Sequence, residues 1–280
     1  VAGSVAVGMP RSSRASDSTM QIVIDEPVGT INPNIYGHFV EHLGAVVYDG
    51  IWVGERSKIA NIDGIRKSIV DALKQIKSPV IRYPGGCFAD SYDWRDGIGD
   101  REKRPRRTNF WYGVAGKDVP IDSTARIEPN EFGTNEFLRF CQLTGSKPYL
   151  AANLRGLTAQ NLYECIDYCN APTGTTSFAN QRASGPLPSK EPFRVEYWGI
   201  GNESWGCGGE LTPEEYAQEF RRFTAAYPPF DTPIKFVGAG ASSDDANWTR
   251  GFFAKMREKS EGLFSRRLYG WGIHHYSWNV

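Results

Sequence analysis

The sequence of 280 residues contains no apolar run near the roughly 20 residues that a membrane-spanning helix needs. It has no excess of either charge, because 32 Lys and Arg residues balance 32 Asp and Glu residues. A complete dinucleotide fingerprint is also missing, since "GAGASS" at 238–243 comes late in the chain and lacks the third glycine. We therefore expect no nucleic-acid partner, no membrane partner and no nucleotide cofactor.

Cysteine and histidine are scarce, and they lack the spacing of a zinc site. His38 and His42 would lie about 13 Å apart on a continuous strand, too far to hold one ion. Cys165 and Cys169 are spaced like helical neighbours, and the total of five cysteines is odd. We therefore expect reduced cysteines without a disulfide framework, and no metal. The five are Cys87, Cys141, Cys165, Cys169 and Cys207.

The overall composition is that of an ordinary globular protein, with 40% hydrophobic and 23% charged residues. Aromatic residues make up 13% of the chain, which suits either sugar stacking or a plain aromatic core. Residues 1–20 are small, polar and aperiodic, so we interpret them as a disordered leader or tag. The sequence leaves the compartment open between cytoplasmic and secreted.

From residue 35 onward, short apolar runs alternate with amphipathic segments. Helices are expected at 63–77, 133–145, 158–170, 213 onward and 244–259. The helix from Pro213 carries the clearest start signal, with Thr212 as cap and Glu215 completing a capping box. The alternation of short apolar runs with amphipathic segments predicts a parallel sheet wrapped by helices. Strands are expected at 35–40, 79–83, 148–153, 193–200, 234–240 and 267–275.

Polar residues stand at the C-terminal ends of several predicted strands, which favours a closed barrel over an open doubly wound sheet. They include Glu41, Asn153, Glu203 and the pair at 274–275. A barrel of this kind has eight βα units, but only about six are recognisable by Val280. The fold class predicted is therefore α/β: either an open sheet, or a (β/α)8 TIM barrel of which residues 35–280 supply strands one to six.

The segment "YWGIGNESWGCGG", residues 197–209, carries the strongest chemical signal. Glu203 follows a strand in a glycine-rich turn, with Trp198 and Trp205 nearby. Tryptophan walls would desolvate the carboxyl group and raise its pKa, which suits a general acid/base. Asn202 would bond a substrate hydroxyl. The plain alternative is a loop carboxylate that caps a backbone N–H.

Two further stretches bring candidate site residues to strand ends. Glu41 closes the first strand in "YGHFVEHLG", where a salt bridge or a helix start would explain it equally well. Cys87 lies in "RYPGGCF", behind a Gly-Gly pair that lets the backbone approach a ligand. A thiol hydrolase with Cys87 as nucleophile and His275 as base remains an alternative.

Taken in order, several stretches resemble glycoside hydrolase family 51, the α-L-arabinofuranosidases, over most of residues 31–280. The two longest and most specific are "RYPGGCFADSYDWRDGIGDREKRP" and "YWGIGNESWGCGG". The others are "INPNIYGHFVEHLG", "NFW", "NEFGTNEFLRFC", "LTPEEYAQEFRRF" and "IHHY".

This resemblance implies a TIM barrel plus a β-sandwich domain, which residues 21–34 would join through the strand "QIVI". It implies a retaining mechanism with two glutamates, in which Glu203 is the acid/base and the nucleophile lies beyond residue 280. Glu41, Cys87 and Asn202 fall on positions that line the arabinose pocket. The remaining candidates for substrate binding are Tyr276, His275 and Trp111. Tyr276 matches the tyrosine beside the nucleophile, His275 would support that tyrosine, and Trp111 would lie at the rim of the pocket.

The sequence departs from the family in two places, an insertion at about 115–126 and "NLRGLT" at 153–158. The function implied is release of terminal arabinofuranosyl groups from arabinoxylan, arabinan or oligosaccharides, as in hemicellulose degradation. Alternatives are an endo-acting glucanase or xylanase and a non-catalytic carbohydrate-binding fragment. Expected partners are the glycan, a second polypeptide segment carrying strands seven and eight with the β-sandwich, and further copies in a homo-oligomer.

Overall fold

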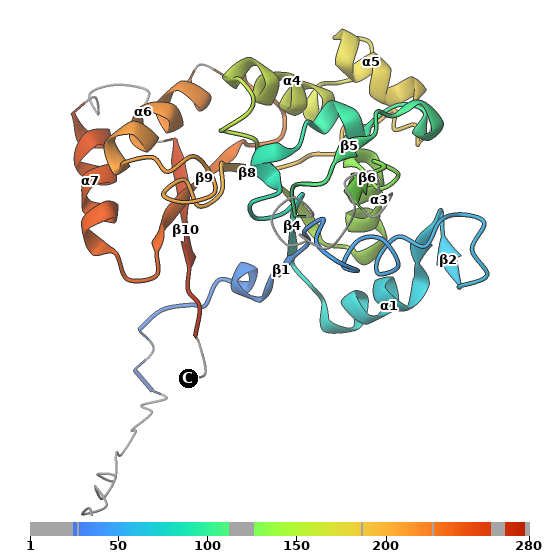
Figure 1. Cartoon of the computed structure of the whole chain (residues 1–280), viewed down its shortest axis with the longest axis horizontal. Helices are drawn as coiled ribbons and strands as arrows, with labels where there is room; N and C mark the ends of the chain where they lie inside the picture. The colour runs from blue at the N-terminus through green and yellow to red at the C-terminus, as the bar shows by residue number, and fades with distance from the viewer. Residues whose placement is uncertain are drawn as a thin grey trace, which may run out of the picture.

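Six parallel strands form one sheet in the computed structural model (Figure 1). The order across the sheet is β1-β4-β7-β8-β9-β10, and every neighbouring pair is parallel. Each strand therefore pairs with the next one along the chain, without the reversal of order that defines a doubly wound sheet. The strands are β1 (His38–Phe39), β4 (Val80–Tyr83), β7 (Lys147–Ala152), β8 (Tyr197–Ile200), β9 (Lys235–Ser242) and β10 (Leu268–His274).

Helices connect successive strands and surround the outer side of the curled sheet, as Figure 1 shows. Parallel neighbours with helical crossovers of this kind form the wall of a barrel, so the sheet is a half-barrel. The α-helices are α1 (Lys67–Ile76), α3 (Thr134–Thr144), α4 (Ala159–Asn170), α5 (Ser177–Ser184), α6 (Pro213–Phe223) and α7 (Ala246–Arg257). Short 3₁₀ turns occupy Pro33–Tyr36, Ala89–Ser91, Trp94–Gly97 and Arg101–Lys103.

The structure describes residues 25–26, 28–111, 126–185, 187–225, 227–258 and 267–277. The predicted leader at 1–20, the strand "QIVI" and nearly all of the insertion at 115–126 lie outside these residues. Within them, no helix has both the length and the apolar character required to cross a bilayer.

The predicted helices and strands are confirmed in order, with changes at their boundaries. The helix expected from residue 63 begins at Lys67, because β2 (Asn61–Ile62) and β3 (Ile65–Arg66) form a hairpin before it. Gly64 lies at φ 85° in this turn, a conformation that favours glycine. The first strand is also shorter than expected, since residues 33–36 form a 3₁₀ turn. Helix α5 and the pair β5 (Arg107–Thr108) and β6 (Ile127–Glu128) were not predicted.

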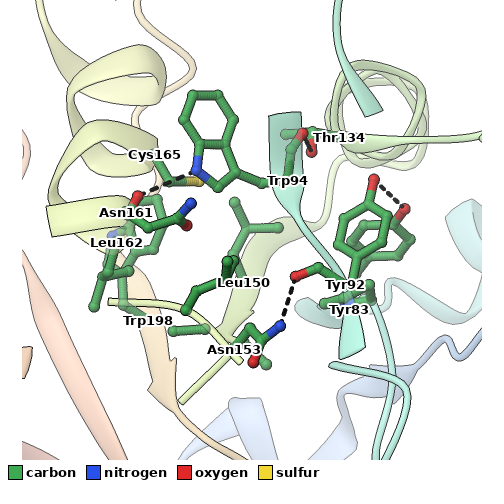
Figure 2. Close-up of a pocket in the computed structure, with 14 residues that line it drawn as sticks. Tyr83, Tyr92, Trp94, Thr134, Leu150, Asn153, Asn161, Leu162, Cys165 and Trp198 are labelled. Atoms are coloured by element: carbon green, nitrogen blue, oxygen red, sulfur yellow. Dashed lines mark hydrogen bonds between the residues drawn. The ribbon is translucent and has the colours of Figure 1, made fainter. Parts of the chain in front are cut away.

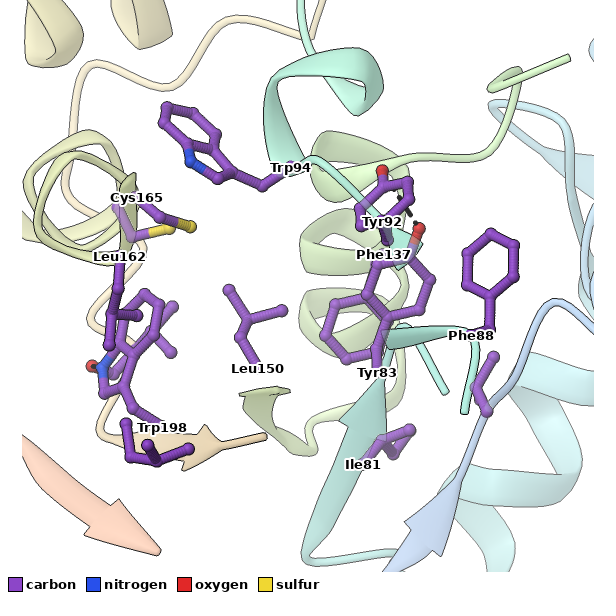
Figure 3. Packing of buried hydrophobic residues seen from close by; sticks show 14 of the residues in the cluster. Ile81, Tyr83, Phe88, Tyr92, Trp94, Phe137, Leu150, Leu162, Cys165 and Trp198 are labelled. Atoms are coloured by element: carbon purple, nitrogen blue, oxygen red, sulfur yellow. Dashed lines mark hydrogen bonds between the residues drawn. The ribbon is translucent and has the colours of Figure 1, made fainter. Parts of the chain in front are cut away.

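The core fills the space between the central strands and the helices outside them (Figure 3). Tyr83 of β4 stacks on Phe137 of α3, with ring centroids 4.4 Å apart. Trp198 of β8 is buried, and its indole N–H donates to the carbonyl of Val195. Aromatic residues thus fill the core here, which is one of the two explanations that their abundance allowed.

Arg182 of α5 is an unusual member of this interior, because its side chain is fully buried. Its guanidinium donates to the carbonyls of Tyr168, Ala171 and Ser189, at 2.6, 2.8 and 3.1 Å. Buried charged donors are stable when their hydrogen bonds are made. One side chain therefore ties the end of α4 to the long connection that leads to β8.

The two outer strands of the half-barrel carry exposed hydrophobic side chains. Phe39 of β1 is 49% exposed, and Tyr269 and Ile273 of β10 are 51% and 68% exposed. All four residues of β8 are buried by contrast. Among the described residues, β1 pairs only with β4 and β10 only with β9, so each has one free edge.

Candidate active site

An open pocket of about 490 Å³ lies at the C-terminal ends of β1, β4, β8 and β10. All seven site residues expected from the sequence line this pocket. The predicted convergence of strand ends is therefore confirmed for four strands, while the third strand contributes no lining residue. Its lining residues are Phe39, Glu41, Leu43, Arg82, Gly86, Cys87, Trp111, Asn202, Glu203, Ile273, His274, His275 and Tyr276.

Glu203 presents its carboxyl group between a histidine and two sulfur atoms. Its Oε1 lies 2.9 Å from Nδ1 of His274, within hydrogen-bond distance. Its Oε2 lies 3.5 Å from the sulfur of Cys207 and 3.8 Å from that of Cys87. The histidine beside the candidate acid is therefore His274, and not His275, which lies 3.4 Å from the Ser277 hydroxyl.

A tightly wound loop holds Glu203 in this position. Glu203 itself adopts φ 43°, which is uncommon for a residue other than glycine, and its carbonyl accepts from the N–H groups of Gly206 and Gly208. A Cβ on Gly208 would come within 2.0 Å of the Asn202 carbonyl oxygen. Glycine at 208 is thus required for the loop to turn back on itself, and the strained backbone at Glu203 is a mark of functional sites.

Asn202 is fixed from two sides by residues that the sequence did not identify. Arg82 donates to its side-chain oxygen at 2.8 Å, which directs the amide nitrogen away from Arg82. Its backbone N–H donates to Asp90, whose carboxyl group also accepts from the N–H groups of Leu154 and Arg155. Burial raises the pKa of Asp90 to about 6, against the lowering effect of these three bonds. Asp90 thus holds the ends of β7 and β8 together.

Glu41 is buried at the edge of the pocket and supports the loop after β4. Its Oε1 accepts from the N–H groups of Gly86 and Phe88, at 2.9 and 3.2 Å. A Cβ on Gly85 would lie 2.6 Å from the Glu41 side chain, so glycine lets loop and carboxylate meet. Glu41 therefore positions the residues on both sides of Cys87.

A disulfide joins Cys87 to Cys207, so the expectation of reduced cysteines throughout the chain was wrong. The pair is separated by 120 residues and meets only because the loops after β4 and β8 converge. No local spacing signals such a contact. Cys87 thus has no free thiol for a hydrolase mechanism in this state, while Cys141, Cys165 and Cys169 are free and buried.

The two tryptophans expected beside Glu203 lie elsewhere. Trp205 donates to the carbonyl of Gly240, and among the described residues it is Trp111 that lines the pocket. Trp198 lines a different and much smaller cavity on the helix side of the sheet (Figure 2). Asn153, the predicted polar end of the third strand, also faces that cavity and donates to the Tyr92 carbonyl. Alternation along each strand sends these side chains to the opposite face.

The atoms nearest to a metal-ligand arrangement in the described chain are those of Cys87, Glu203 and Cys207, within 4.8 Å of one another. Because the two sulfur atoms are bonded to each other, neither is a thiolate that could bind a metal. His38 and His42 contact different groups, Ser78 in one case and Glu128 with Tyr83 in the other. Their side chains therefore do not converge on one site.

The sequence of this chain matches a known protein family and several of its members. The model of the alpha-L-arabinofuranosidase 1 domain matches residues 72–277. An intracellular exo-alpha-L-arabinofuranosidase of Bacteroides ovatus is 38% identical over 252 residues, which cover 90% of this chain and 46% of that protein. Alpha-L-arabinofuranosidase C of Emericella nidulans is 38% identical over 219 residues, covering 77% and 40%.

Solved structures agree with these matches. The GH51 arabinofuranosidase of Xanthomonas axonopodis pv. citri superposes with a TM-score of 0.78 at 39% identity, over 90% of this chain and 47% of that one. The family 51 enzyme AbfB of Bifidobacterium longum gives a TM-score of 0.74 at 30% identity, over 92% and 48%.

The half-barrel, the strand-end pocket and the relatives together place this chain among the glycoside hydrolase families. The chain belongs to the α-L-arabinofuranosidases of glycoside hydrolase family 51. It spans about half the length of the curated relatives it matches.

Proposed function

We propose that this chain forms the acid/base half of a retaining arabinofuranosidase. The enzyme releases terminal α-L-arabinofuranosyl groups from arabinoxylan, arabinan or oligosaccharides. The observation that carries the proposal is the position of Glu203, at the end of β8 in a pocket, 2.9 Å from His274. A carboxyl group so placed protonates the leaving glycosidic oxygen and later takes a proton from water.

The remaining pocket residues supply recognition of the sugar. Asn202 offers its amide nitrogen to a hydroxyl beside the reacting carbon, since Arg82 occupies its oxygen. Trp111 lines the pocket, and its ring would stack on the group that leaves. Glu41, Cys87, His275 and Tyr276 complete the wall. Cys87 contributes as one end of a disulfide and not as a thiol.

Removal of terminal groups is favoured over endo-cleavage by one comparison. The Bacteroides ovatus relative, which covers 90% of this chain, is named an exo-acting enzyme. An endo-glycanase on glucan or xylan would need a cleft that extends on both sides of the reacting bond. We therefore assign the terminal arabinofuranosyl group, and not an internal backbone sugar, to the pocket.

The second carboxylate of the retaining mechanism is proposed to be a glutamate beyond residue 280. In such enzymes the two carboxyl groups lie about 5–5.5 Å apart. The free edges of β1 and β10 and their exposed Phe39, Tyr269 and Ile273 fit a segment that docks between them. That segment would bring strands seven and eight, the nucleophile beside Tyr276, and the β-sandwich. We call this chain together with that segment the complete enzyme.

Glu203→Gln in the complete enzyme tests the proposal. Turnover of alkyl arabinofuranosides, which have poor leaving groups, should fall by roughly 10²–10⁴-fold. The first step on a 4-nitrophenyl arabinofuranoside should fall much less, because that leaving group needs little protonation.

Glu210→Gln is the matched control, since Glu210 belongs to the same loop and is exposed. It should leave both rates unchanged. Equal losses on both substrates in Glu203→Gln would overturn the acid/base role and indicate a structural residue or the nucleophile itself.

A further inference from the structure

The disulfide between Cys87 and Cys207 joins the two loops that build the reacting end of the pocket. Cys87 follows β4, and its neighbours Gly86 and Phe88 are held by the Glu41 carboxylate. Cys207 lies in the loop that carries Glu203, four residues after that glutamate. The bond therefore ties the loop of the candidate acid to a loop that is itself anchored on the end of β1.

Both sulfur atoms touch the carboxyl group that the proposed reaction uses. They lie 3.5 and 3.8 Å from Oε2 of Glu203, while Oε1 faces His274. A disulfide sulfur carries no proton, so it offers Oε2 a contact surface and no hydrogen bond. The carboxyl group is thereby held between an imidazole on one side and a fixed, non-donating wall on the other.

Breaking the disulfide changes both the position of the two sulfur atoms and their lack of a proton. Two non-bonded sulfur atoms cannot remain as close as two bonded ones, so they must move apart, by rotation of the side chains or by separation of the loops, and their contact with Oε2 of Glu203 changes. Each sulfur also gains a proton and becomes a weak donor beside Oε2. A displacement of about 1 Å at a reacting group costs up to about 10²-fold in rate.

The bond is also within reach of a small reductant. Cys87 lines the open pocket, and both cysteines are half-buried. The other three cysteines are buried in the core and unpaired. Thiol–disulfide exchange in the described chain would therefore act at the pocket alone.

We propose that Cys87 and Cys207 are positioning residues whose disulfide holds Glu203 in its reactive place, and that a dithiol which reduces this bond lowers turnover reversibly. In this reaction the two thiols of the reductant become a disulfide. Their two electrons and two protons convert the bond into the thiols of Cys87 and Cys207. The proposal rests on the acid/base function proposed above for Glu203.

The test compares the complete enzyme after purification in air, after treatment with dithiothreitol, and after reoxidation with glutathione disulfide. Alkylation in denaturant followed by peptide mass mapping reports whether Cys87 and Cys207 are free, separately from the three cysteines of this chain that are free in both states. Reduction should lower kcat/KM on alkyl arabinofuranosides, which reports the first step, by roughly 10- to 100-fold. It should lower kcat/KM on the 4-nitrophenyl substrate much less, because that leaving group needs little protonation, and reoxidation should restore both values.

Two variants separate positioning from general stability. Cys207→Ser should show the reduced-state rate under both conditions, with no response to dithiothreitol. Cys141→Ala, at a buried free thiol of α3, should respond to dithiothreitol as the unmodified enzyme does. If Cys207→Ser does not fold, the reversible response of the unmodified enzyme remains the decisive measurement.

Free thiols at Cys87 and Cys207 in the air-purified protein would overturn the inference, as would kcat/KM values that reduction leaves unchanged or lowers equally on both substrates. An oxidised enzyme without any arabinofuranosidase activity would instead contradict the proposed function. Hydrogen exchange at Gly206, Gly208 and Gly209 tests the disulfide without turnover, because their N–H groups bond within the loop. Reduction should accelerate this exchange, and equal exchange in both states would count against the positioning role.

Discussion

The central and outer strands of the same sheet are built differently. In β4 and β8, seven of eight residues are buried, and large aromatic side chains pack between sheet and helices. In β1 and β10 the free edges carry exposed Phe39, Tyr269 and Ile273. The central strands are thus packed on both faces, while the outer strands expose hydrophobic side chains, as the docking segment proposed above requires. Four predictions test this difference, beginning with the largest effect.

The chain of residues 1–280 produced alone should have no arabinofuranosidase activity and should aggregate. Among the residues that the structure describes, the sheet has two free edges, and the proposed nucleophile lies beyond residue 280. Co-expression with the proposed segment that carries strands seven and eight and the β-sandwich should restore both solubility and turnover of 4-nitrophenyl arabinofuranoside. Activity of a monomer of the chain alone, measured after size-exclusion chromatography, would break the comparison.

Phe137→Ala should lower the free energy of unfolding of the complete enzyme by about 3–5 kcal/mol. Phe137 is fully buried and stacks on Tyr83 of β4, so truncation leaves a cavity beside a central strand. Urea denaturation followed by circular dichroism measures the loss. A loss below about 1 kcal/mol would mean that this part of the core is loosely packed.

Asp90→Asn should destabilise the protein by about 1–3 kcal/mol at pH 4.5. The amide nitrogen of the new side chain would face one of the backbone N–H groups from which Asp90 accepts a hydrogen bond. Burial raises the pKa of Asp90 from 3.8 to about 6. Its stabilising contribution is therefore fully present below pH 4 and is lost as the pH rises through 6. The difference between Asp90→Asn and the unmodified protein should shrink by pH 7. A difference that grows with pH in urea denaturation would contradict the sign of this shift.

Tyr269→Ala should have the smallest effect, within about 0.5 kcal/mol in the isolated chain if it can be kept soluble at low concentration. In the complete enzyme the loss should rise to about 1.5–3 kcal/mol, because the proposed segment would bury this ring. Ile76→Ala at the end of α1 is the control, since Ile76 is 60% exposed and does not belong to a strand of the sheet. Equal small losses for Tyr269→Ala in both proteins would mean that β10 stays uncovered.

Much of the fold was predictable because its signals are local. The start of α6 at Pro213 follows from Thr212 and Glu215, and the end of α3 follows from Gly145, which lies at φ 77°. Repetition of strand and helix predicted the parallel sheet, and the order of polar strand ends predicted the pocket. Each of these patterns spans only a few residues, so one sequence suffices to recognise it.

The parts of the site that escaped prediction depend on contacts between distant segments. Cys87 and Cys207 are 120 residues apart, and Asp90 reaches N–H groups of Leu154 and Asn202. His274 and His275 are adjacent, and only the course of β10 decides which one faces Glu203. Trp198 was misplaced for the same reason, since the face of β8 that it occupies depends on register. The resemblance to a family identified positions, but not these supports.

The buried guanidinium of Arg182 has a consequence for digestion by trypsin. Trypsin cleaves after arginine and lysine only where the side chain and several flanking residues can enter the protease. Lys190 is exposed in the same connection, although Glu191 and Pro192 follow it, whereas Arg182 is inaccessible while its three carbonyl partners hold it. Cleavage after Arg182 therefore requires α5 to come away from the end of α4, and the rate at which that fragment forms reports how often this part of the protein opens.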